Sequence, residues 1–147
     1  MALRSLPKDR PVKVLFVRPP RHFWPIINES DNFLLPLGYP CLAAYLRERM
    51  ADVEVEILDC CVQQVGWKSL RVEYARRRPD VVCIGELTMY GKEGFRGFEL
   101  AREVLPDCLT VAGGYLYSAL PEWSLEKCPA LDVVVRLEGE ETLRDLL

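Results

Sequence analysis

The sequence lacks recognisable metal-ligand spacing, because it contains a single histidine, His22, and cysteines at irregular intervals. These cysteines match neither the paired spacing of a zinc site nor the run that holds an iron–sulfur cluster. Several lie among apolar neighbours, where a reduced cysteine packs as a small hydrophobe. We therefore expect no metal ligands among them and interpret the six as packing residues, namely Cys41, Cys60, Cys61, Cys83, Cys108 and Cys128.

Long apolar runs are also absent. No segment approaches the roughly 18 apolar residues of a membrane span, and residues 1–10 are polar where a signal peptide would be apolar. A net charge of −3 and a pI near 5.3 argue against a nucleic-acid backbone as the main partner. We expect a cytoplasmic protein that binds neither a membrane nor a nucleic acid.

Several catalytic and nucleotide-binding motifs are missing. The sequence contains no G-x-x-x-x-G-K-[ST], which excludes a P-loop, and no G-x-G-x-x-G after its first predicted strand, which excludes the dinucleotide fingerprint. A catalytic triad would need His22, and nothing in the pattern positions partners for it. A phosphorelay receiver needs an acidic pair after the first strand and an aspartate after the third, where this chain has Val17-Arg18 and Gly85-Glu86. We expect no catalytic residue in this chain.

The chain does contain regularly alternating apolar segments. A run that is apolar on both faces lies between Asp80 and Thr88 and ends at Gly85, which is typical of a central parallel strand. The segment VEVEIL alternates apolar and acidic residues, which indicates an edge strand. With these two, the expected strands are Val12–Val17, Val53–Leu58, the central run, Leu109–Ala112 and Asp132–Arg136.

Helical periodicity separates these strands. The expected helices are Leu37–Met50, Lys68–Arg78, Gly91–Leu105, one that starts near Leu120 with Pro121 first, and Thr142–Leu147. In the third of these helices we expect Arg102 to snorkel from an apolar face to water. Alternating strands and helices predict an α/β fold, flavodoxin-like (Rossmann-like), with a five-stranded parallel sheet in the order 2-1-3-4-5 and helices on both faces. Residues 1–147 then form one domain.

In such a sheet, ligands bind beyond the carboxyl ends of the strands. Four segments meet at that edge, and three of them contain glycine, which lets a ligand approach the backbone. Glycine at the ends of both the central strand and its neighbour therefore predicts a site for a bulky ligand. The four segments are Arg18–Pro20, Gly85–Thr88, Gly113–Tyr115 and Leu137–Glu140.

Six segments carry a family resemblance. In order they are VKVLFVRPP, PLGYPCLAAYLRE, VEVEILD, RPDVVCIGELT, LTVAGG and DVVVRLEGEETLRDLL. Together they resemble the N-terminal cobalamin-binding domain of B12-dependent radical SAM proteins, a family that includes methyltransferases and the anaerobic magnesium-protoporphyrin monomethyl ester cyclase. The resemblance implies a corrin ring over the carboxyl edge and a nucleotide tail between the first and third strands.

The resemblance also implies a set of cofactor-binding residues. Gly85-Glu86-Leu87 occupies the place of a Ser-x-Leu motif and Gly113-Gly114 that of a Gly-Gly motif, whereas the Asp-x-His-x-x-Gly motif that supplies a lower cobalt ligand is absent. Glu86 either accepts a hydrogen bond from the cofactor's amides or lies solvated, and Tyr115 either stacks on the cofactor or blocks it. His22 is either a cobalt ligand or a solvated loop residue. The implied residues are Gly85, Glu86, Leu87, Thr88, Gly113, Gly114, Tyr115, Glu138 and Gly139.

Radical SAM chemistry needs a C-x-x-x-C-x-x-C cluster motif, and this sequence has none. We therefore expect that the natural protein continues beyond Leu147 into a C-terminal radical SAM domain, which would hold S-adenosylmethionine and the 4Fe-4S cluster in cis. Two alternatives stay open at this point. The chain could be a degenerate flavodoxin-like domain that serves protein–protein contact, or it could bind another cofactor such as FMN.

Overall fold

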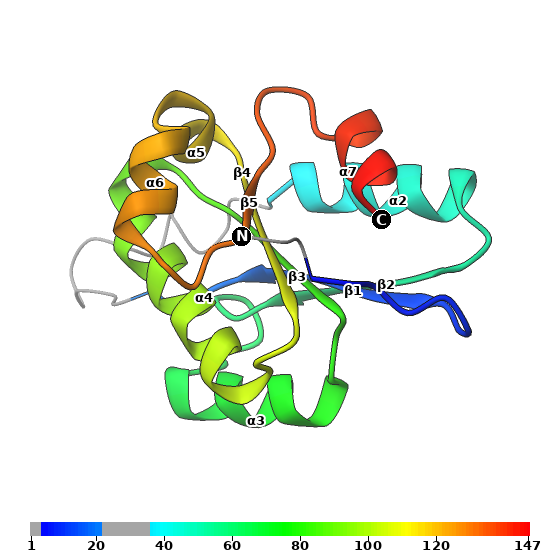
Figure 1. Ribbon diagram of the computed structural model, residues 1–147. Coiled ribbons are helices and arrows are strands. Elements are labelled where there is room, and N and C mark those ends of the chain that lie inside the picture. Colours follow the sequence, from blue (N-terminus) through cyan, green and yellow to red (C-terminus); the bar gives the residue numbers. More distant parts are fainter. Residues whose placement is uncertain (1–3, 22–35) are drawn as a thin grey trace.

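Five parallel strands form a single sheet in this computed structural model, which describes residues 4–21 and 36–147 (Figure 1). The strand order is β2-β1-β3-β4-β5, so the predicted order 2-1-3-4-5 is confirmed. All four neighbouring pairs run parallel. The strands are β1 (Val12–Arg18), β2 (Val53–Asp59), β3 (Val81–Gly85), β4 (Leu109–Gly113) and β5 (Val133–Val134).

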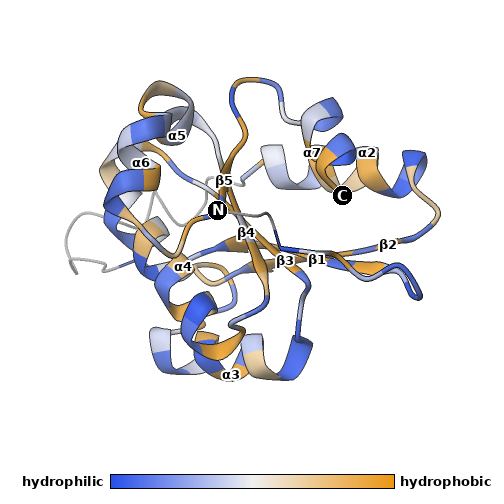
Figure 2. Cartoon of the chain, in the orientation of Figure 1, coloured by the Kyte–Doolittle hydropathy of each residue, from blue (hydrophilic) through white to orange (hydrophobic). Residues whose placement is uncertain are grey.

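The strands are apolar on both faces because the sheet separates two hydrophobic cores. In β1, Val14 and Phe16 belong to one core, and Leu15 and Val17 to the other. Figure 2 shows the same feature as an apolar sheet between helices whose outer sides are hydrophilic. Strand β2 forms the edge beyond β1 with its glutamates exposed, which confirms the prediction from the alternating VEVEIL segment.

Helices cover both faces of the sheet (Figure 1). On one face lie α2 (Gly38–Arg49) and α7 (Glu140–Leu146), whose buried Leu46 and Leu143 share a core with Phe16. The core of the other face contains Tyr74, Phe98 and Tyr117, and its helices are α3 (Trp67–Arg77), α4 (Gly91–Val104), α5 (Tyr115–Ala119) and α6 (Pro121–Lys127). Within residues 4–21 and 36–147, no helix is long and apolar enough to cross a membrane.

The largest departures from the predicted elements occur near the ends of the strands. Strand β5 is reduced to two paired residues, because it is an edge strand and the chain turns at Leu137, where φ is 58°. A short 3₁₀ helix, η1 (Thr88–Tyr90), and α5 were not predicted, since elements this short show no periodicity. The last helix begins at Glu140, two residues before the predicted start.

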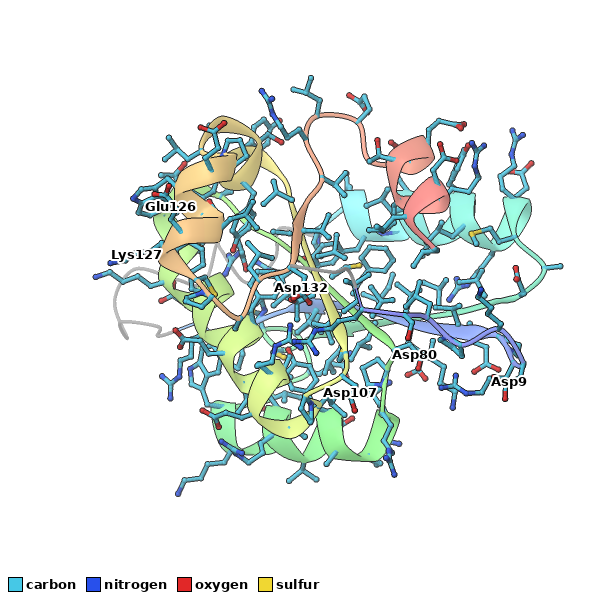
Figure 3. All side chains as sticks on the ribbon, in the orientation of Figure 1. Asp9, Asp80, Asp107, Glu126, Lys127 and Asp132 are labelled. Carbon is cyan, nitrogen blue, oxygen red and sulfur yellow. The ribbon has the colours of Figure 1, made fainter. Side chains whose placement is uncertain are left out.

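The prediction that Arg102 snorkels to water is wrong. Its Nη2 atom lies 2.7 Å from the Oδ2 atom of Asp132, and its Nη1 atom donates to the carbonyl oxygens of Pro106 and Cys108. Asp132 lies inside the fold, whereas Glu126 and Lys127 of α6 point outward (Figure 3). Arg102 therefore joins α4 to the segment that leads into β5, and its charge is compensated within the protein.

The cysteines fulfil the predicted packing role, with one exception. Five of the six are buried and all six are free thiols, while Cys41 is exposed. Burial raises the pKa of Cys60 to about 12, so this thiol stays protonated at neutral pH. Buried, protonated thiols are unreactive and act as small apolar side chains.

Candidate functional site

A cavity of about 480 Å³ opens at the carboxyl edge of the sheet. It extends between the strands and the two helices α2 and α7, where its walls are apolar. The volume falls within the range of about 300–1000 Å³ that is typical of small-molecule sites. The apolar residues that line its inner part are Phe16, Leu42, Cys83, Val111, Val135 and Leu143.

Two glycines lie side by side in the wall of the cavity. Gly85 at the end of β3 and Gly113 at the end of β4 are direct partners in the sheet. Side chains alternate along a strand, so both positions face α2 and α7, as Cys83 and Val111 do two residues earlier. A Cβ atom at Gly113 would have only the carbonyl oxygen of Val135 near it, at 3.8 Å. A Cβ atom at Gly85 would instead lie 3.4 Å from both the Tyr39 ring and the Gly113 carbonyl oxygen. Gly113 therefore leaves open space in the cavity, whereas Gly85 lets Tyr39 pack close to the end of β3.

Position 114 needs a glycine for a different reason, which is its backbone conformation. Its φ of 86° lies in the left-handed region, which residues with a side chain rarely adopt. A Cβ atom there would also lie 3.3 Å from the backbone nitrogen of Glu86. The Gly-Gly pair thus combines one position that opens the cavity with one that lets β4 turn tightly against the end of β3.

Tyr39, the second residue of α2, closes the gap between the ends of β1 and β3. Its hydroxyl accepts a hydrogen bond from the Gly85 N–H at 2.8 Å and lies 3.0 Å from the carbonyl oxygens of Val17 and Gly85, which share its single proton as acceptors. Its ring stacks on Phe16 with centroids 5.5 Å apart. Tyr39 therefore links the ends of β1 and β3, and the cavity extends from there along β3 and β4 beneath α2 and α7.

Glu86 is buried, and the interpretation of it as a solvated carboxylate is wrong. Only 3% of the residue is exposed, and the Nη2 atom of Arg21 lies 2.9 Å from its Oε2 atom. Burial raises the pKa of Glu86 to about 7, although the charge and hydrogen bond of Arg21 act in the opposite direction. The Arg21 guanidinium lies 3.4 Å from the centre of the Tyr90 ring. An ion pair therefore lies in the wall of the cavity at the end of β3.

The structure brings most of the predicted binding residues to this cavity. Tyr115 borders the cavity and is 78% exposed, so it does not fill the space. Thr88 begins η1 and is not among the lining residues, whereas His22 lies outside the described residues. The predicted residues that line the cavity are Gly85, Glu86, Leu87, Gly113, Gly114, Tyr115, Glu138 and Gly139.

Sequence reasoning missed several other residues of the cavity. Arg21 and Tyr39 gave no signal of their own, because their roles depend on partners far along the chain, at separations of 65 and 46 residues. Leu42 and Leu143 belong to apolar helix faces, and periodicity does not distinguish a residue that packs on the sheet from one that borders a cavity.

Comparisons with known proteins point to one family. A family model described as the B12 binding domain matches residues 24–147. Two curated relatives are similar over 92% of the chain: an uncharacterized methyltransferase of Pyrococcus horikoshii is 29% identical, and the anaerobic magnesium-protoporphyrin IX monomethyl ester cyclase of Rubrivivax gelatinosus is 26% identical. The chain spans 29% and 24% of the lengths of these two proteins.

The fold has a solved counterpart. The cobalamin-dependent S-adenosylmethionine radical enzyme OxsB, with aqua-cobalamin and S-adenosylmethionine bound, superposes with a TM-score of 0.73 at 23% sequence identity. The match covers 94% of this chain and 18% of the OxsB chain. Because the family model covers most of the sequence, the chain belongs to the B12-binding domain family, and it resembles the corresponding domain of B12-dependent radical SAM enzymes.

Proposed function

We propose that this domain binds cobalamin, with the corrin ring over the carboxyl edge of the sheet and the nucleotide tail in the cavity beneath α2 and α7. The observation that carries the proposal is the side-by-side pair Gly85 and Gly113, which opens onto a cavity with apolar inner walls. A flat macrocycle needs backbone without side chains beneath it, and its tail needs a deep apolar slot. The rim residues Leu87, Tyr115 and Glu138 would border the ring.

Cobalamin supplies organometallic chemistry at its cobalt when it is bound, and the protein supplies binding and orientation. In this proposal the glycine edge supports the ring, and the side chains of α2 and α7 exclude water from the tail. The sequence has no Asp-x-His-x-x-Gly motif, which is the motif that would supply a lower histidine ligand to cobalt. We therefore propose that cobalt has no lower histidine ligand.

We further propose that the domain acts with a radical SAM domain that holds S-adenosylmethionine and a 4Fe-4S cluster. The support comes from OxsB, which is named as a cobalamin-dependent S-adenosylmethionine radical enzyme and of which the match covers only 18%. The curated relatives are named as a methyltransferase and a cyclase, and the chain spans only 29% and 24% of them. The reaction would then be a methyl transfer or a cyclisation performed by the whole enzyme, and this chain would contribute no catalytic residue.

The test is uptake of hydroxocobalamin by the purified chain, followed by desalting and an absorption spectrum. We expect corrin bands to remain with the wild-type protein and to be lost in Gly113→Leu, whose side chain would extend into the cavity. Ala75→Leu adds bulk on an exposed position of α3, on the other side of the sheet, and should retain cobalamin. A wild-type protein that emerges colourless would contradict the proposal and favour a protein-contact role, and a protein that is yellow as purified would favour FMN.

A further inference from the structure

The ion pair between Arg21 and Glu86 is only half formed. One contact joins the Nη2 atom of Arg21 to the Oε2 atom of Glu86. The Nε atom of Arg21 and the Oε1 atom of Glu86 are both buried, and neither has a hydrogen-bond partner among the residues that the structure describes. The side chains are only 9% and 1% exposed, and both residues line the cavity.

Both members of the pair are held in place by their surroundings. The guanidinium of Arg21 stacks on the Tyr90 ring. The carbonyl oxygen of Glu86 accepts a hydrogen bond from the Leu116 N–H at 3.2 Å, and Gly114 packs against the Glu86 backbone. The donor and the acceptor without partners therefore belong to a defined wall of the site.

Buried polar atoms in proteins nearly always have a hydrogen-bond partner, so an unpartnered donor and an unpartnered acceptor on two side chains that contact each other call for an explanation. The Nε–H group of Arg21 needs an acceptor, and the ionised Oε1 atom of Glu86 needs a donor. A primary carboxamide offers both, through its carbonyl oxygen and its NH₂ group. A carboxylate would be repelled by Glu86 and a cation by Arg21, so the neutral pair selects a neutral group with both functions.

We propose that Arg21 and Glu86 form a subsite for a primary carboxamide of the bound ligand, in which Arg21 Nε donates to the amide oxygen and the amide NH₂ donates to Glu86 Oε1. The inference rests on the proposed function, because primary carboxamides project from the edge of the corrin ring. It adds to that function the recognition of one amide group by a charged pair.

The experiment compares hydroxocobalamin with the three monocarboxylic acids obtained when one of its propionamide groups is hydrolysed. Affinities are measured by absorbance titration at pH 8, where a carboxyl with a pKa of about 7 is ionised. For one of the three acids, the wild-type protein should bind about 10- to 100-fold more weakly than it binds hydroxocobalamin, which is the range of a charge-assisted hydrogen bond.

For the variant Glu86→Gln we expect the opposite preference between hydroxocobalamin and that monocarboxylic acid. When the side-chain oxygen of the introduced glutamine accepts from Arg21, its NH₂ group replaces the Oε1 acceptor with a donor, which suits a carboxylate and not an amide. The variant should therefore prefer that same acid over hydroxocobalamin. Arg21→Lys keeps the charge but lacks Nε, so it should weaken hydroxocobalamin binding without this reversal. Glu122→Gln, on an exposed position of α6, should behave as the wild-type protein.

Three outcomes are distinguishable. Reversal confined to Glu86→Gln and to one acid supports the subsite. If the ratio of the affinity for hydroxocobalamin to the affinity for each acid is the same in wild type and Glu86→Gln, the subsite is overturned. Arg21 and Glu86 then bind only each other, and the proposal of cobalamin binding is unaffected. Failure of wild type and Glu122→Gln alike to take up hydroxocobalamin overturns the proposed function, and the subsite with it.

Discussion

Replacing Glu86 by glutamine should change how the stability of the protein depends on pH. Burial raises the pKa of Glu86 from 4.5 to about 7, with Arg21 and Arg18 acting in the opposite direction and Glu93 adding to the increase. The folded protein thus binds the Glu86 proton more tightly than the unfolded chain does. Its contribution to stability is fully present below about pH 4.5 and is lost as the pH rises towards and through about 7.

The magnitude follows from the change in pKa. The pKa of Glu86 rises from 4.5 to about 7, and at about 1.36 kcal/mol for each pKa unit this amounts to about 3 kcal/mol. Glutamine is neutral at every pH and has the same shape, so it should remove this dependence. Between pH 4.5 and pH 8, the unfolding free energy of wild type should fall by about 3 kcal/mol relative to that of Glu86→Gln.

The assay is urea unfolding followed by circular dichroism at several pH values between about 4.5 and 8, a range that spans the titration of Glu86. Wild type, Glu86→Gln and the exposed control Glu122→Gln are compared, and the other titrating groups cancel in the differences because they are common to all three. We expect the control to follow the wild type, while the curve of Glu86→Gln separates upward as the pH rises. Parallel curves for all three proteins would refute the assignment of a raised pKa to a buried Glu86.

Two further predictions concern stability at a single pH. Tyr39→Phe keeps the ring but leaves the partly buried Gly85 N–H without its partner, which should lower the unfolding free energy by about 1–3 kcal/mol in urea; an unchanged urea midpoint would contradict the role of Tyr39 in joining the strand ends. Gly94→Ala would place a Cβ atom 2.2 Å from the buried Tyr117 hydroxyl oxygen and should cost about 1–3 kcal/mol. Gly38→Ala, at the first position of α2 with no atom within 4 Å of its Cβ, should cost less than about 0.5 kcal/mol because alanine favours a helix, and equal losses in the two alanine variants would rule out the steric explanation.

The site combines an apolar interior with a charged pair in its wall. Gly113 provides space by the absence of a side chain, and Tyr39 packs against Gly85 and limits that space on the β1 side. The exposed Tyr115 and Leu137, at 78% and 82%, leave an apolar rim around the opening. This arrangement suits a ligand with a flat face and an apolar tail, and the ion pair adds selectivity for a polar group at the edge.

The sequence alone determined the architecture. Strands that are apolar on both faces, separated by helical periodicity, specify a parallel sheet between two helical layers, and the alternating segment at Val53 marks its edge. Glycines at the ends of two adjacent strands predicted a ligand at the carboxyl edge, which is where the structure has its cavity. The predicted architecture was confirmed because it depends on local pattern and on the general rules of α/β folds.

Tertiary structure alone decided which polar groups meet at that edge. Glu86 had the sequence context of a surface carboxylate, and its burial against Arg21 depends on two segments that lie 65 residues apart. Arg102 was expected in water and instead pairs with Asp132, 30 residues further along the chain. Hydrogen bonds and burial are set by distances of a few ångström between remote residues. Such distances leave no periodic trace in a sequence, whereas the apolar pattern that builds the layers does.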